Sequence, residues 1–257
     1  MAPAPVYDEI GRGYVVTRRP DPRIGRAIRD ALGDSRTAVN VGAGAGAYEP
    51  GDLLVVAVEP SLEMIRQRPQ GAAPAVQAMA ERLPFAGGAF DAALAVLTVH
   101  HWKDHAAGLA ELARVAHRRV VILTWDPAFR PGFWLTDAYL PAIVDLDVPR
   151  FPSMAEIARS FGQVRVTPLP IPHDCADGFL GAFWRRPHAY LDPGVRRGIS
   201  AFAQLPPGAV DAGLDRLAAD LASGGWDARF GALRRQDTID LGYRLIVAEP
   251  ARWREER

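Results

Sequence analysis

The chain has 257 residues, enough to bury one substantial core, and 49% of them are hydrophobic against 23% charged. These proportions are typical of a globular protein and argue against long disordered segments. The formal net charge is zero, so no basic excess supports nucleic-acid binding. The single cysteine, Cys175, excludes an intrachain disulfide and any multi-cysteine metal site.

The first residues lack a basic start followed by an apolar run, and no later stretch reaches the about 18 apolar residues of a membrane span. We therefore expect a cytoplasmic protein with small-molecule partners, without nucleic-acid or membrane binding and without a metal. The sequence leaves the oligomeric state open.

Along the chain, a helix is predicted from Pro22 to Gly33 and closes an N-terminal helical arm at residues 1–34. Short apolar runs then alternate with helical stretches as far as Trp125. The predicted strands are Ala38–Val41, Leu53–Val58, Ala75–Gln77, Ala92–Leu97 and Val120–Thr124. Continuous apolar runs separated by helices indicate a parallel sheet covered on both faces, and hence a doubly wound α/β fold. In such folds ligands bind at the carboxyl ends of the strands.

After Pro127 the pattern changes to aromatic and proline-rich segments. A helix is predicted at Met154–Phe161, a strand at Val164–Leu169, and a last strand at Leu241–Ala248. The mostly helical block at residues 171–240 is interpreted as a cap inserted before the last strand. The whole chain, 1–257, is then a single Rossmann-like domain.

Three glycines, Gly42, Gly44 and Gly46, follow the first predicted strand. Glycines there let the backbone turn tightly and let a ligand approach main-chain N–H groups. The same letters also satisfy the dinucleotide fingerprint G-x-G-x-x-A, with Ala47 in the last place. A tight turn without a ligand is a further alternative, so this motif alone is not specific.

Glu59 ends the second predicted strand, where a carboxylate can accept hydrogen bonds from both hydroxyls of a ribose. Alternatively, it is an acid that initiates the next helix. A dinucleotide fold spends about 20 residues before this acid, whereas here Glu59 lies thirteen positions after Gly46 and Pro50-Gly51 interrupts the interval. A short helix or a loop is a poor seat for a pyrophosphate, so adenosine without phosphate is favoured.

Four segments, in order, resemble the class I S-adenosylmethionine-dependent methyltransferases, in particular the methyltransferase type 11 group. They are Val39–Gly46, Ala57–Ser61, Ala78–Phe85 and Phe90–Trp102, and Arg114–Thr124 extends the match. The resemblance implies a mostly parallel seven-stranded sheet whose last strand is antiparallel. It also implies S-adenosyl-L-methionine as cofactor and in-line transfer of its methyl group to a small molecule.

The resemblance further implies where the cofactor lies. The three glycines would face its methionine and ribose portions, Glu59 the ribose hydroxyls, the N–H of Ala80 the adenine, and Leu97 the sulfonium. The implied cofactor-binding residues are Tyr14, Asn40, Gly42, Gly44, Gly46, Glu59, Pro60, Met64, Met79, Ala80, Glu81 and Leu97. Two of them depart from the family pattern, because Asn40 and Met79 stand where the family usually has acids.

His100 and His101 follow the fourth strand, beside the expected methyl group, and imidazole can accept a proton near neutral pH. They are the candidate catalytic bases, with His101 preferred from the resemblance, although each could instead hydrogen-bond a loop carbonyl. A base matters only for an acceptor of high pKa.

The predicted substrate-binding residues are Trp102, Trp125, His173 and Trp184. Trp125, at the end of the fifth main strand, would line an apolar pocket. Most other aromatic residues after it are expected in the core of the cap. His173 would hydrogen-bond the substrate or belong to a structured loop.

Three alternatives to a methyltransferase are open. One is a protein of this fold that binds the cofactor for other chemistry or binding alone. An NAD-dependent oxidoreductase is disfavoured by the short interval before Glu59. The third is a partner-binding module with a vestigial pocket.

Overall fold

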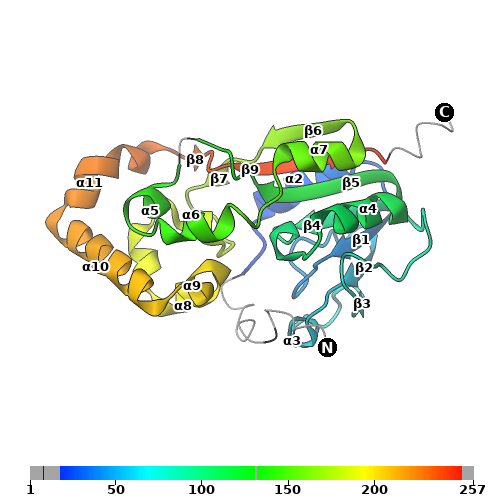
Figure 1. Cartoon of the computed structure of the whole chain (residues 1–257), viewed down its shortest axis with the longest axis horizontal. Helices are drawn as coiled ribbons and strands as arrows, with labels where there is room; N and C mark the ends of the chain where they lie inside the picture. The colour runs from blue at the N-terminus through cyan, green and yellow to red at the C-terminus, as the bar shows by residue number, and fades with distance from the viewer. Residues whose placement is uncertain (1–7, 9–17, 131, 251–257) are drawn as a thin grey trace.

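A computed structural model of the chain describes residues 8, 18–130 and 132–250 (Figure 1). Its centre is a seven-stranded sheet with the order β3-β2-β1-β4-β5-β9-β6. The strands are β1 (Thr37–Val41), β2 (Leu54–Val58), β3 (Ala75–Val76), β4 (Phe90–Val96), β5 (Ala116–Trp125), β6 (Val164–Pro168) and β9 (Tyr243–Ala248). Neighbouring strands from β3 to β5 pair in parallel, whereas β9 runs antiparallel to both β5 and β6. The predicted fold class is confirmed.

Both faces of the sheet are covered. On β5, Val121 and Leu123 join one hydrophobic cluster, while the alternate residues Val120 and Ile122 join another. Successive side chains of a strand point to opposite faces, so the two clusters mark the two sides of the sheet. Helix α2 (Pro22–Leu32) packs in the first cluster, and α4 (His105–Val115) and α7 (Met154–Phe161) pack in the second. A shorter helix, α3 (Leu62–Arg66), follows β2.

Apart from the short helix η2 (Val99–His101) after β4, the remaining helices gather beside the sheet and form the cap (Figure 1). The cap consists of α5 (Trp134–Ala138), α6 (Ala142–Asp147), η3 (Leu180–Phe183), η4 (Pro187–Leu191), α8 (Pro193–Arg197), α9 (Ser200–Gln204), α10 (Pro207–Ser223), α11 (Gly225–Phe230), η5 (Gly231–Arg235) and the ladder of β7 (Ile171–Pro172) with β8 (Thr238–Ile239). Helices α5 and α6 come from the crossover between β5 and β6. They therefore lie outside the block 171–240 that the sequence indicated as the cap. The sequence did not reveal them, because helices of five and six residues are too short to show a helical period.

Aromatic side chains form the core of the cap, as expected. The ring of Trp134 meets the rings of Tyr139, Tyr190 and Trp226 edge to face at centroid distances of 5.9, 5.7 and 5.3 Å. Its indole N–H donates to the backbone carbonyl of Trp184 at 2.8 Å. These rings belong to the same hydrophobic cluster as one face of the central sheet, so the cap and the sheet share a core.

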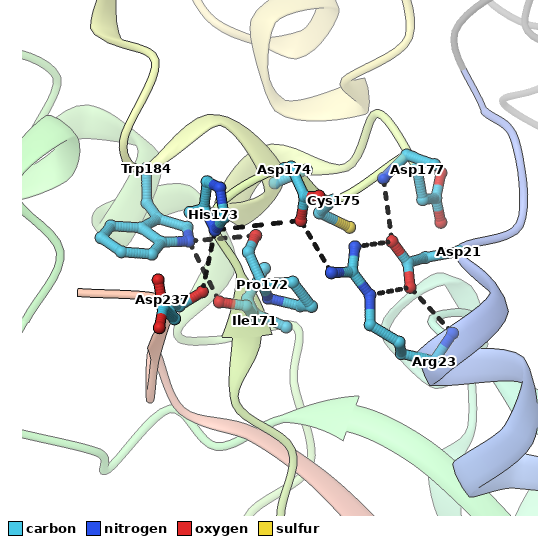
Figure 2. A network of polar contacts seen from close by, with 12 residues as sticks. Asp21, Arg23, Ile171, Pro172, His173, Asp174, Cys175, Asp177, Trp184 and Asp237 are labelled. Atoms are coloured by element: carbon cyan, nitrogen blue, oxygen red, sulfur yellow. Dashed lines mark hydrogen bonds and ion pairs between the residues drawn. The ribbon is translucent and has the colours of Figure 1, made fainter. Parts of the chain in front are cut away.

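A polar network ties the base of the cap to the N-terminal helix (Figure 2). Asp21 caps α2 by accepting a hydrogen bond from the N–H of Arg23 at 2.9 Å, and it also accepts from the N–H of Ala176 at 3.0 Å. The guanidinium of Arg23 bonds Asp174 at 2.7 Å. Burial alone would raise the pKa of Asp21, but the bonds from Arg23 and Ala176 hold it below its usual range. The chain beyond β7 is thus fixed against α2.

Among the described residues, none of the helices combines the length and the apolar character that crossing a bilayer requires.

Candidate functional site

Two cavities lie at the carboxyl ends of the central strands, and Leu97 and Arg18 line both of them. The first, of about 440 Å³, is the glycine-loop cavity. Its other lining residues include Asn40, residues 42–48, Glu59, Met64, Gln67, Thr98 and His101. The second, of about 270 Å³, is the aromatic cavity, which the cap covers. Its other lining residues include His100, Trp125, Phe129, Phe133, Asp147, Phe151, Phe179 and Tyr243.

The glycine loop follows β1 directly. Gly42 has a φ of +69°, and a Cβ there would stand 1.9 Å from the Thr98 hydroxyl oxygen. Gly44 has a φ of +53°, and a Cβ there would stand 3.3 Å from the terminal methyl of Met64. Residues 42–53, all of them described, form turns and bends without a helix. The prediction that a loop or a short helix replaces the first crossover helix is confirmed.

Glu59 lies at the end of β2 and is only 5% exposed. One carboxylate oxygen accepts from the N–H of Gly44 at 2.8 Å, and the other accepts from the N–H of Ser61 at 2.9 Å. Burial raises the pKa of Glu59, although these two bonds oppose the shift. The hydroxyl of Ser61 caps α3 by accepting from the N–H of Met64 at 3.2 Å. Because Ser61 supplies that cap, Glu59 is left to face the cavity, where its remaining lone pairs can accept hydrogen bonds.

Asn40 presents an acceptor to the same cavity. Its amide nitrogen donates to Glu49 at 3.2 Å, while its amide oxygen is buried without a hydrogen-bond partner among the described residues. Arg68 pairs with Glu49 at 2.7 Å and also donates to the carbonyl of Gly44 at 3.2 Å, which holds the loop in place. A buried acceptor is costly without a donor, so this wall fits a ligand with N–H groups.

His101 and His100 divide between the cavities. His101 lines the glycine-loop cavity and His100 the aromatic cavity, with ring centroids 3.8 Å apart. Phe151 stacks on His100 at 4.2 Å. Burial, together with the nearby charges of Arg150 and Arg18, lowers the pKa of His101 to about 4, and burial lowers that of His100 well below its usual value. Both imidazoles are therefore neutral near pH 7 and are weak bases.

Arg18 joins the two cavities and was not predicted from the sequence, where no motif surrounds it. Its guanidinium pairs with the buried carboxylate of Asp177 at 2.6 Å. The same carboxylate accepts the hydroxyl of Tyr48, from the end of the glycine loop, at 2.9 Å. This contact joins residues far apart in the chain, so only the folded structure reveals it.

One predicted substrate residue, Trp125, lines the aromatic cavity, together with several residues that the sequence did not single out. Among them is Asp147, the last residue of α6. Burial raises the pKa of its carboxyl to about 6, against the opposing charge of Arg150. Asp147 and the more exposed Asp137 thus stand in a largely apolar wall, which Arg18 and Arg130 also line.

Seven predicted residues do not line either cavity. They are Pro60, Met79, Ala80, Glu81, Trp102, His173 and Trp184. The carboxylate of Glu81 accepts from the N–H of Lys103 at 2.7 Å, and Trp102 packs against Gly108 of α4. Tyr14 lies outside the described residues. The roles of these residues stay predictions.

Two of the seven belong to the base of the cap (Figure 2). The indole N–H of Trp184, which is fully buried, donates to the carbonyl of Ile171 at 3.1 Å. The backbone N–H of His173 donates to the carbonyl of Asp237 at 2.9 Å. Both contacts support the β7–β8 ladder. Over the part of the chain that the structure describes, no three His, Cys, Asp or Glu side chains gather into a site for a metal ion.

Comparisons with known proteins agree with this arrangement. A family model described as a methyltransferase domain, of type 11, matches residues 39–123. A protein from Anabaena variabilis, described as a methyltransferase from an antibiotic biosynthesis pathway, is 33% identical in sequence. The match covers 90% of this chain and 98% of that chain, with a TM-score of 0.84. No protein of curated function matches the sequence.

Two more distant structures share the fold. An S-adenosylmethionine-dependent methyltransferase from Thermotoga maritima is 23% identical, with 64% of this chain and 84% of that chain covered and a TM-score of 0.51. A phosphoethanolamine N-methyltransferase from Haemonchus contortus, solved with S-adenosylhomocysteine, is 14% identical, with 89% and 52% covered and a TM-score of 0.52.

The Anabaena likeness extends over nearly the whole of both chains, at a sequence identity of 33%. The chain belongs to the class I S-adenosylmethionine-dependent methyltransferases and uses S-adenosylmethionine as its cofactor.

Proposed function

We propose that the glycine-loop cavity holds S-adenosylmethionine and that the aromatic cavity holds a small-molecule methyl acceptor. The observation that carries this proposal is the junction of the two cavities, since Leu97 and Arg18 line both. A methyl group at that junction would have the cofactor on one side and the acceptor on the other, as in-line displacement requires.

Within the glycine-loop cavity, we assign Glu59 to the ribose hydroxyls and the amide oxygen of Asn40 to the ammonium group. Gly42, Gly44 and Gly46 bring the backbone close to the ligand. When bound, the cofactor supplies a methyl group on a positively charged sulfur. The protein has to align the acceptor with that methyl group and to exclude water.

His100 and His101 lie beside the junction, one in each cavity. With a pKa of about 4, His101 takes up a proton too weakly to serve as an efficient base at neutral pH. We therefore propose that the two imidazoles position the acceptor by hydrogen bonding. The acceptor then needs a nucleophile that is reactive without full proton removal.

The aromatic lining of the second cavity favours a planar or lipophilic metabolite, and we assign Trp125 to its wall. The likeness to the Anabaena protein supports specialised metabolism as the setting. The proposed enzyme is a transferase of one-carbon groups that acts on a small molecule, and we propose the cytoplasm as its location.

The test uses the purified protein in two steps. Calorimetry should show binding of S-adenosylhomocysteine, and incubation with methyl-labelled S-adenosylmethionine and small-molecule extracts should give a labelled product. Cofactor binding without label in any product would instead support the alternative in which the protein only binds the cofactor or uses it for other chemistry.

A further inference from the structure

One charged group in the aromatic cavity has no role in the proposed transfer. Asp147 is the last residue of α6, at the carbonyl end of the helix, where a negative charge is disfavoured by the helix dipole. Around it the cavity wall carries aromatic rings, including those of Trp125, Phe151 and Tyr243. The helix end and the apolar rings both disfavour the charge.

Among the described residues, the protein compensates this carboxylate only in part, through the charge of Arg150. Within the described part of the chain it accepts no hydrogen bond and forms no ion pair. The nearby guanidinium of Arg150 donates instead to the side chain of Gln204 at 2.6 Å. Arg18, which also lines the cavity, is paired with Asp177. Within the described part of the chain, the carboxylate of Asp147 therefore has no direct ion-pair partner, and only the charge of Arg150 acts on it from nearby.

A partly buried carboxylate beside aromatic rings matches one kind of ligand group. An ammonium ion donates charge-assisted hydrogen bonds to a carboxylate, and its charge is attracted to the faces of aromatic rings. A neutral ligand would leave the charge of Asp147 uncompensated, and an anionic ligand would be repelled by it.

We propose that the methyl acceptor carries a basic nitrogen and that Asp147 binds this nitrogen as an ammonium ion. This inference rests on the proposed function, because it identifies the substrate class of the same cavity. Alkyl ammonium groups have a pKa of about 10, so a carboxylate that titrates near 6 does not remove their proton. A protonated nitrogen has no lone pair for the methyl group. The nitrogen is thus a recognition group, and the methylated atom is a different one, at the Leu97 end of the cavity.

Three probes of nearly equal shape test the inference. Phenethylamine is cationic, 2-phenylethanol is neutral, and 3-phenylpropionate is anionic at neutral pH. Their affinities are measured by calorimetry with the wild-type protein saturated with S-adenosylhomocysteine. We expect phenethylamine to bind most tightly. In Asp147→Asn we expect its affinity to fall about tenfold or more, while that of 2-phenylethanol changes less than about twofold.

The matched control is Asp145→Asn, which removes an exposed carboxylate from the same helix two residues earlier. It should leave all three affinities unchanged. Asp147→Asn should bind S-adenosylhomocysteine as the wild type does, which shows that the fold and the first cavity are intact.

The inference is overturned if 2-phenylethanol or 3-phenylpropionate binds as well as phenethylamine, if the amine preference survives Asp147→Asn, or if no probe binds at millimolar concentration while S-adenosylhomocysteine binds. A wild-type protein that fails to bind S-adenosylhomocysteine would overturn the proposed function, and this inference with it.

Discussion

The two cavities adjoin each other but are built by different means. The glycine-loop cavity is lined largely by residues at or just after the ends of β1, β2 and β4, and Gly42, Gly44 and Gly46 expose their backbone to it. The aromatic cavity is made of side chains from β5, β9 and the cap. A site of backbone groups tolerates little change of local conformation, whereas a site of side chains from distant segments can alter its chemistry one residue at a time. Substitutions in the two cavities should therefore have different effects.

The largest expected effect is on cofactor affinity. Replacing Glu59 by glutamine removes the charged acceptor proposed for two ribose hydroxyls. Hydrogen bonds to a charged group contribute about 1.5–3 kcal/mol each, so we expect a loss of about 100-fold or more in the affinity for S-adenosylhomocysteine, measured by calorimetry. The control is Asp34→Asn, an exposed carboxylate before the amino end of β1. Equal affinity in Glu59→Gln and the control would remove Glu59 from the ribose site.

The next effect is on the loop itself. Gly42→Ala places a Cβ at a φ of +69° and 1.9 Å from the Thr98 hydroxyl oxygen. We expect the free energy of unfolding to fall by about 2–3 kcal/mol in urea titrations, because the backbone is strained and Thr98 must shift. Gly51→Ala, later in the same loop, has no atom within 4 Å of the added Cβ and should be close to neutral. Similar losses in both variants would contradict this account of the loop.

In the aromatic cavity we expect a substitution, that of Asp147, to raise the free energy of unfolding rather than to lower it. The folded-state pKa of Asp147 is raised from 3.8 to about 6, so the folded chain binds more protons than the unfolded chain between these values. The destabilisation is therefore absent at low pH, grows as pH rises through this window, and is complete above it. The charge of Arg150 opposes the rise in the pKa of this carboxyl, and the carboxylate in turn helps to raise the pKa of the buried phenol of Tyr243.

Asp147→Asn should accordingly stabilise the protein by about 1–2 kcal/mol at pH 8, after allowance for solvent screening. At pH 5 the gain should be smaller. Urea titrations at both pH values provide the measurement, with Asp145→Asn as control. A loss of stability at pH 8 would mean that the charge of Asp147 is stabilised by the protein.

The smallest expected effect concerns the contacts of Tyr48, at the end of the glycine loop, with Asp177 and Asp21. The hydroxyl of Tyr48 donates to Asp177 at 2.9 Å and accepts from the N–H of Asp21 at 3.3 Å. Burial raises its pKa far above the ordinary value, so the hydroxyl stays protonated. Tyr48→Phe should cost about 1 kcal/mol of unfolding free energy and speed amide hydrogen exchange in residues 42–48. Tyr139→Phe, which removes a hydroxyl bonded to Asp220 in the cap, should leave that exchange unchanged.

The residues that the sequence identified correctly share one property. Each of them lies in a continuous stretch of the chain, whose pattern can be recognised from the sequence alone. This holds for the apolar runs of β1, β2, β4 and β5 and for the glycine loop. The segments around Asp147 and Arg18 carry no such pattern. The sequence proposed Trp184 and His173 as substrate-binding residues, with a structured loop as the alternative for His173. Both lie in the base of the cap and line neither cavity, and their roles stay predictions.

The sequence by itself determined the sheet, the loop that replaces the first crossover helix, and the position of Glu59 at a strand end, because each depends on neighbouring residues. The folded structure was needed to show that α5 and α6 join the cap, that Arg18 and Leu97 link two cavities, and that Asp147 lines the second without an ion-pair partner among the described residues. The physical reason is that burial and charge compensation depend on segments brought together by folding. The residues that these segments bring to the wall of the aromatic cavity determine which acceptor can bind.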